Sequence, residues 1–133
     1  MARTAKQVQG DIISLLRNAD WESLISGKIY RNGYRPIDST KEDIIVTHTA
    51  GIPDRFQSGI VTINIYVEDM PEGENGRRVE ELEKLAQSWV EELIPIQPMG
   101  YVFELQETIH SIKDEERPQH FIAIKLKYQF FNQ

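Results

Sequence analysis

The side chains able to perform metal or acid–base chemistry are few in this 133-residue chain and lie far apart in the sequence. His48, His110 and His120 each fall on or beside a predicted strand, without a second histidine two or four residues away. A metal site would need them to converge with carboxylates in the fold. The chain has no cysteine, which excludes disulfides, thiolate metal ligands and cysteine nucleophiles. We therefore expect no metal site.

The glycines do not form a loop suited to binding a phosphate. Gly73 and Gly76 are close in sequence, but Glu72 and Glu74 beside them would repel an anion. The sequence also has no nucleophile elbow and no motif that groups a serine with a histidine and an acid. Nothing in these patterns indicates phosphoryl transfer or nucleophilic catalysis.

One group of acids offers paired carboxylates for general acid–base work, namely Asp38, Glu42 and Asp43. The surrounding residues 39–43, Ser-Thr-Lys-Glu-Asp, instead indicate a polar approach to a strand. We predict that the protein is not an enzyme and that it needs no cofactor.

Bases lie beside aromatic residues at Tyr30, Arg31, Tyr34 and Arg35, as in platforms that bind single-stranded nucleic acid. The formal net charge of −6 argues against a surface that binds a polyanion. The alternative is that the aromatic rings pack in the fold and the arginines pair with nearby acids. We expect no sequence-specific nucleic-acid binding.

The negative charge is concentrated in one part of the chain. Residues 68–92 hold nine acids and three bases, a sum of −6, and the remaining residues hold 12 of each sign. Residues 1–35 carry six bases and three acids. Either an acidic helix face is exposed to solvent, or patches of opposite charge meet between subunits.

Two amphipathic helices are predicted from apolar residues spaced three and four apart. The first covers residues 4–18 and contains Gly10, which costs about 1 kcal/mol relative to alanine. The second covers residues 79–93, and Pro95 and Pro98 are expected to end it.

Alternating apolar and polar residues predict five strands. They cover residues 28–30, 43–49, 59–67, 101–109 and 122–130. Residues rich in turn formers predict loops at 50–55 and 71–76, and a polar hairpin tip at 113–118.

These elements predict one α+β domain over residues 1–133. We expect a mostly antiparallel sheet of four to five strands with two helices packed on one face, in the order α-β-β-β-α-β-β. Water or a partner must then cover the other face, which carries Thr62, Asn64, Lys125, Lys127 and Gln129. No apolar run reaches the roughly 18–20 residues that span a membrane, and the first residues do not resemble a signal peptide. We expect a cytoplasmic protein without membrane contact.

Two segments resemble small proteins encoded in phage and prophage tail-morphogenesis clusters. They are residues 33–46, GYRPIDSTKEDIIV, and residues 59–67, GIVTINIYV. The order of elements over residues 25–130 is similar to that of tail-terminator or tail-completion proteins of long-tailed phages. The resemblance implies a ring-forming structural subunit that caps the tail tube, joins it to the head and lets DNA pass. It carries over no catalytic residue.

On this hypothesis the protein is a homo-oligomer that contacts other tail or neck proteins, first in the bacterial cytoplasm and then in the virion tail. The segment 68–92 either lines the channel or meets residues 28–35 of the adjacent subunit. The predicted interface residues are Arg31, Arg35, Ile52, Phe56, Glu72, Glu74, Glu80 and Glu83. The alternative is a small cytoplasmic adaptor or binding module that pairs a peptide strand with its exposed sheet edge.

Overall fold

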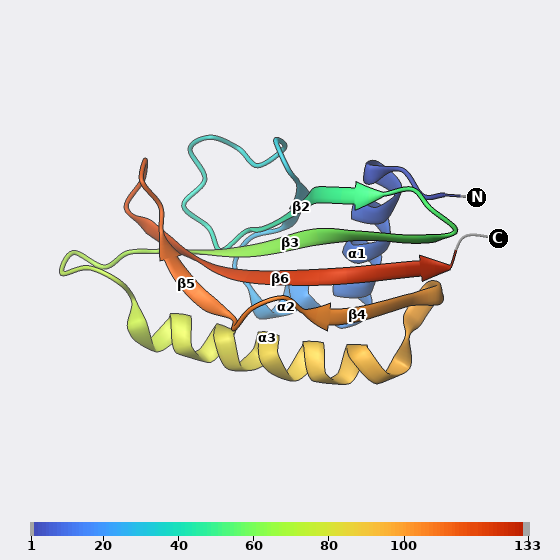
Figure 1. Ribbon diagram of the computed structural model, residues 1–133. Helices are drawn as coiled ribbons and strands as arrows, with labels where there is room; N and C mark the ends of the chain where they lie inside the picture. The colour runs from blue at the N-terminus through green and yellow to red at the C-terminus, as the bar shows by residue number, and fades with distance from the viewer. Residues whose placement is uncertain (1, 132–133) are drawn as a thin grey trace.

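The computed structural model describes residues 2–131 and shows helices packed against one six-stranded sheet (Figure 1). The α-helices are α1 (Ala5–Asn18), α2 (Trp21–Leu24) and α3 (Gly76–Ile96), and a short 3-10 helix covers Pro98–Gly100. The strands are β1 (Ile29–Arg31), β2 (Ile44–Ile52), β3 (Phe56–Glu68), β4 (Tyr101–Leu105), β5 (His110–Lys113) and β6 (Gln119–Phe131). The predicted α+β class is confirmed.

The sheet is larger than predicted and is mixed. Its order is β1-β2-β3-β6-β4, and β5 also pairs with β6. β1 runs parallel to β2, whereas all the other pairs are antiparallel. The expectation of four to five strands was therefore too low, and the expectation of two helices missed the single turn of α2.

Helix α1 begins where the sequence pattern predicts, because its first residues form a capping box. The Thr4 hydroxyl accepts a hydrogen bond from the Gln7 amide, and the Gln7 side chain accepts one from the Thr4 amide. The apolar stripe of the helix, which includes Val8, Ile12 and Leu16, is buried at no more than 1% exposure.

Helix α3 extends beyond both predicted ends. The Asn75 side chain accepts a hydrogen bond from the Arg78 amide and caps its first turn. At the other end Pro95 lies within the last turn, and the helix ends at Ile96 because Gln97 takes a left-handed conformation with φ 51°. Pro95 thus lies just inside the helix end that it was expected to set.

The region predicted as one strand over 101–109 holds β4 and then residues 106–109, which are not in a strand, and β5 begins at His110. Leu105 pairs with Leu126, and His110 pairs with Ala123. Five steps along this edge therefore match only three steps along β6, so the chain bulges outward between the two strands. Alternation alone does not reveal such a bulge.

Half of the region predicted as a loop over 50–55 is strand. β2 continues to Ile52 and β3 starts at Phe56, which leaves a three-residue turn at Pro53–Arg55. Gly51 and Gly59 face each other in the register, and a Cβ at Gly59 would meet the Ala50 carbonyl and the Tyr128 hydroxyl. These glycines permit close strand pairing here, although their composition is typical of a loop.

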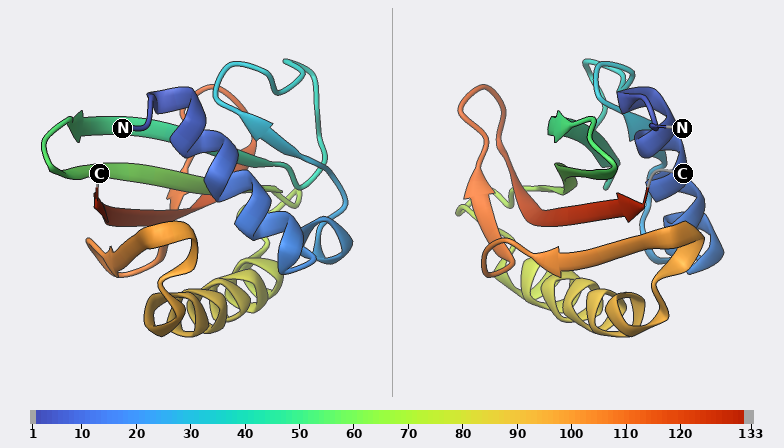
Figure 2. Two further views of the ribbon diagram at one scale, coloured as in Figure 1. Left: turned by 90° about the vertical axis from the view of Figure 1, so that its right-hand side faces the viewer. Right: turned by 45° about the vertical axis from the view of Figure 1, so that its right-hand side comes forward.

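The core lies on one face of the sheet, between the strands and the helices (Figure 2). Alternate residues of β3 and β6 on this face are 0–3% exposed, and they belong to the same cluster as the buried stripes of α1 and α3. The opposite face of these strands holds the intervening residues, so the predicted inward and outward sets are confirmed. We call this opposite face the outer face.

Candidate interaction surface

One end of the outer face is covered by the chain itself. The segment 32–43 places the guanidinium of Arg35 over the ring of Tyr66, with 4.3 Å from its carbon to the ring centroid. Arg35 Nε donates to Asp43 Oδ2 at 2.9 Å, and the two side chains are only 8% and 2% exposed. We call this region, with Phe121 packed on Tyr66 at 5.3 Å between ring centroids, the covered end.

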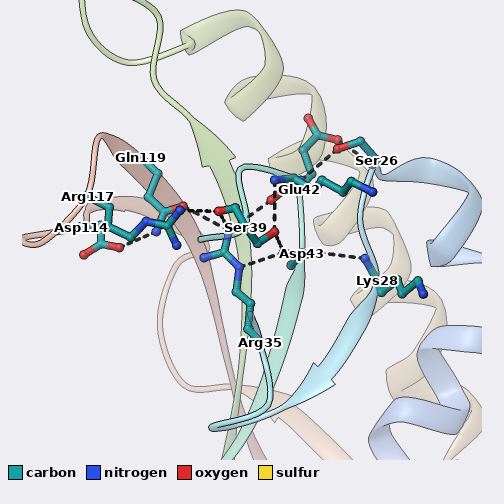
Figure 3. Close-up of polar contacts among 10 residues, drawn as sticks. Ser26, Lys28, Arg35, Ser39, Glu42, Asp43, Asp114, Arg117 and Gln119 are labelled. Atoms are coloured by element: carbon teal, nitrogen blue, oxygen red, sulfur yellow. Dashed lines mark hydrogen bonds and ion pairs between the residues drawn. The ribbon is translucent and has the colours of Figure 1, made fainter. Parts of the chain in front are cut away.

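A second layer of hydrogen bonds connects the covered end to the β5–β6 hairpin (Figure 3). Arg35 Nη2 donates to Gln119 Oε1 at 3.2 Å, and Gln119 Nε2 donates to Asp114 Oδ2 at 2.6 Å. The guanidinium of Arg117 donates to the carbonyl oxygen of Ser39. Two loops that are far apart in the sequence are thereby held together.

Asp43 is the centre of this network. Burial acts to raise its pKa, but hydrogen bonds from Ser39, from Arg35 and from the Lys28 amide outweigh burial and keep the pKa below its ordinary value. Gly27 is required beside it, because a Cβ there would collide with the carboxylate. The carboxylate that sequence analysis weighed as a catalytic group is therefore fully engaged in a structural role.

The two predicted basic interface residues have different positions in the structure. Arg35 is buried in the covered end, where it contacts Asp43 and Tyr66 of its own chain. Arg31 is partly exposed and lies against α1, where a Cβ at Gly10 would be 2.9 Å from Arg31 Nη2. The glycine that weakens α1 thus gives Arg31 room.

Three of the four predicted acidic residues come together near the start of α3. Burial raises the pKa of Glu83, and so do the negative charges of Glu74 and Glu80. Glu80 also pairs with Lys84 at 3.1 Å. Glu72, the fourth, is exposed in the loop before the helix. The structure thus groups three of the four predicted acidic residues.

The histidines do not converge. His48 Nε2 lies 2.7 Å from the Tyr128 hydroxyl, and burial lowers the pKa of His48. His120 lies between Asp69 at 2.6 Å and Glu74 at 3.1 Å. Tyr128 and His120 are eight residues apart on β6, about 26 Å. Within residues 2–131 no group of three or more His, Asp or Glu side chains is arranged to hold a metal.

The other end of the outer face carries four exposed apolar side chains, with Ser58 and Gln129 in the register between Ile52 and Val102. The four apolar side chains are exposed by 63% at Ile52, 60% at Phe56, 44% at Val102 and 41% at Phe131. Phe56 and Phe131 are paired in the register, with ring centroids 4.9 Å apart. We call these four residues the open-end patch.

Ile52 and Phe56 were among the predicted interface residues, and they lie at the end of β2 and the start of β3. Val102 and Phe131 were not predicted. Val102 pairs with Gln129, which was expected on the outer face, so Val102 shares that face. Phe131 follows Phe130 and continues the alternation of β6 by one residue. The alternating pattern extended by one residue would have found Phe131.

Among the described residues, no helix combines the length and the apolar composition needed to cross a membrane.

No protein-family model matches the chain, and no curated protein matches it.

Proposed function

We propose that the chain is a non-catalytic structural subunit of a phage or prophage tail or neck, of the tail-terminator type, which forms a ring of identical subunits. The observation that carries this proposal is the open-end patch. Exposed apolar side chains that gather on one surface of a small protein mark a site of association. The other end of the same face is covered by the chain's own loop, so the uncovered end is a specific feature rather than a general property of the sheet.

The arrangement of charge also supports this role. The tail-terminator ring of the proposal must pass DNA without retaining it. The cluster of Glu74, Glu80 and Glu83 supplies negative potential on one part of the surface, and like charge repels a duplex. The covered end meanwhile ties up Arg35 and Arg117 within the chain, which leaves fewer cations free to bind phosphates.

The proposal is tested by sedimentation velocity over a concentration and salt series. The wild type is expected to form a closed oligomer that persists at high salt, because apolar burial is not screened by ions. Phe56→Ser is expected to reduce association strongly.

The matched control for that experiment is Ile37→Ser. Ile37 is 92% exposed but lies on the segment 32–43, away from the open-end patch. Association equal to that of the wild type is expected for this variant. A wild-type monomer at every concentration would contradict the proposal.

A second candidate is an adaptor that pairs a peptide strand with a sheet edge. It is favoured by the short length of β1, which pairs only with Ile44–Val46 and leaves the outer edge of β2 from Thr47 to Ile52 without a strand partner among the described residues. Tail and capsid genes beside this gene would support the ring subunit, and a metabolic or regulatory neighbourhood would support the adaptor.

A further inference from the structure

A groove on the helical side of the molecule has the properties expected of a docking site. Two hollows of about 170 and 220 Å³ adjoin each other between the end of α1, α2 and the second half of α3, and they share Ala19, Trp89 and Glu92. Leu24 and Ile96 line them and are 37% and 68% exposed. We call this feature the helix groove.

The helix groove is apolar and contains one carboxylate. Trp89 contributes to its floor and is braced by Trp21, with ring centroids 6.2 Å apart in an edge-to-face arrangement. Glu92 is exposed and has no ion-pair partner within residues 2–131. An occupant that fits it would therefore present apolar side chains and one cation.

The β2–β3 turn has this composition. Ile52 and Phe56 flank it, and Arg55 stands at its tip with its guanidinium carbon 5.8 Å from the ring centroid of Phe131. No ion pair joins Arg55 to another residue of the described chain. The turn thus carries the apolar side chains and the single cation that would complement the helix groove.

Within one molecule the turn and the helix groove lie apart. In the left view of Figure 2 the turn is at the far left, whereas the end of α1 and the helix α3, whose residues line the groove, lie at the lower right and at the bottom. A chain cannot insert its own turn into its own groove without unfolding the hairpin. Contact between the two surfaces must therefore join two copies.

We propose that the β2–β3 turn of one copy docks in the helix groove of a second copy, with Arg55 paired to Glu92. This inference rests on the proposed function and names the contact that builds the ring. Because the two surfaces differ, the contact is head-to-tail and repeats from copy to copy, which produces a closed ring when the rotation allows. A twofold dimer does not result from it.

The absence of cysteine makes the contact directly testable, since an introduced thiol is the only one in the chain. Arg55→Cys and Glu92→Cys are prepared as separate proteins, mixed and treated with a short bismaleimide cross-linker. The mixture is expected to give a covalent dimer, whereas each variant alone gives little. Glu115→Cys replaces Glu92→Cys as the control, because Glu115 is exposed at the tip of the β5–β6 hairpin.

Charge exchange tests the ion pair independently. Arg55→Glu and Glu92→Arg are each expected to weaken association about fivefold, and the double exchange is expected to restore it. An oligomer in which positions 55 and 92 do not cross-link, or in which position 55 links to itself, would overturn this inference and leave the proposed function in place. A chain that never associates would overturn both.

Discussion

The two ends of the outer face are built from the same strands, but one end is covered by a loop of the chain and the other is exposed. At the covered end, Tyr66 is capped by Arg35, and the arginine is neutralised by Asp43 inside the chain. At the open end, ten residues and about 33 Å along β3, Phe56 packs on Phe131 and remains 60% exposed.

This contrast separates the residues that stabilise the monomer from those available to a partner. A buried ion pair with several hydrogen bonds strongly resists the removal of one member, because the other is left buried and charged. Exposed apolar side chains contribute little to the monomer and gain most from burial by a second molecule. Substitutions at the covered end should therefore lower the stability of the monomer, whereas substitutions at the open end should weaken association and change monomer stability little.

The largest effect on stability is expected at the covered end. Arg35→Ala leaves Asp43 buried without its cation, and we expect the free energy of unfolding to fall by about 3–5 kcal/mol. Urea denaturation measures this loss. Arg31→Ala is the control and is expected to cost about 1 kcal/mol at most, since Arg31 has no comparable partner. Similar losses for the two variants would contradict the distinction between them.

A smaller loss is expected where β2 and β3 approach each other near the open end. Gly59→Ala places a methyl group against the Ala50 carbonyl and 2.6 Å from the Tyr128 hydroxyl, so we expect a loss of about 1–3 kcal/mol in a thermal melt. Gly76→Ala has no atom within 4 Å and is expected to cost nothing. An unchanged melting temperature for Gly59→Ala would mean that β2 and β3 are not closely packed at this position.

How much of this the sequence predicts depends on the range of the interaction. The alternation of apolar and polar residues identified the buried faces of β3 and β6, because the residue type at each position indicates directly whether that position is buried. The sequence also indicated Ile52 and Phe56 as candidate interface residues. The predicted loop was too long because Gly51, a residue typical of loops, pairs with Gly59 in a closely packed part of the sheet.

The partner of Arg35 was not predictable in the same way. Three acids lie close to it in sequence, and only the fold selects Asp43 among them. Gln119, which also binds Arg35, is 84 residues away. Long-range polar networks of this kind leave no periodic signal in the chain.

The covered end is also expected to respond to acid. The pKa of Asp43 is lower in the folded chain than its ordinary value of 3.8. The ionised carboxylate therefore contributes fully to the free energy of unfolding above pH 3.8, and this contribution is lost as the pH falls through the pKa of the folded state. Thermal melts between about pH 3 and pH 7 should show Asp43→Asn less stable than the wild type at neutral pH, with the gap narrowing in acid. A constant gap would contradict this assignment.

The smallest effect on monomer stability is expected at the open end. Ile52→Ser removes a side chain that is 63% exposed, so we expect a change of about 0.5 kcal/mol or less. Denaturation is measured at a concentration where the chain is monomeric. Ile63→Ala, at a fully buried position of the same sheet, is expected to cost about 2–5 kcal/mol. A large loss for Ile52→Ser would mean that the open-end patch belongs to the core.

The central claim is that only the open end of the outer face binds a second molecule. Hydrogen exchange measured over a series of protein concentrations tests this claim most directly. As concentration rises, we predict increasing protection of residues 51–57 and of the second half of α3, with no change over residues 32–43. Exchange that is independent of concentration everywhere, or protection that appears over residues 32–43 instead, would contradict the account.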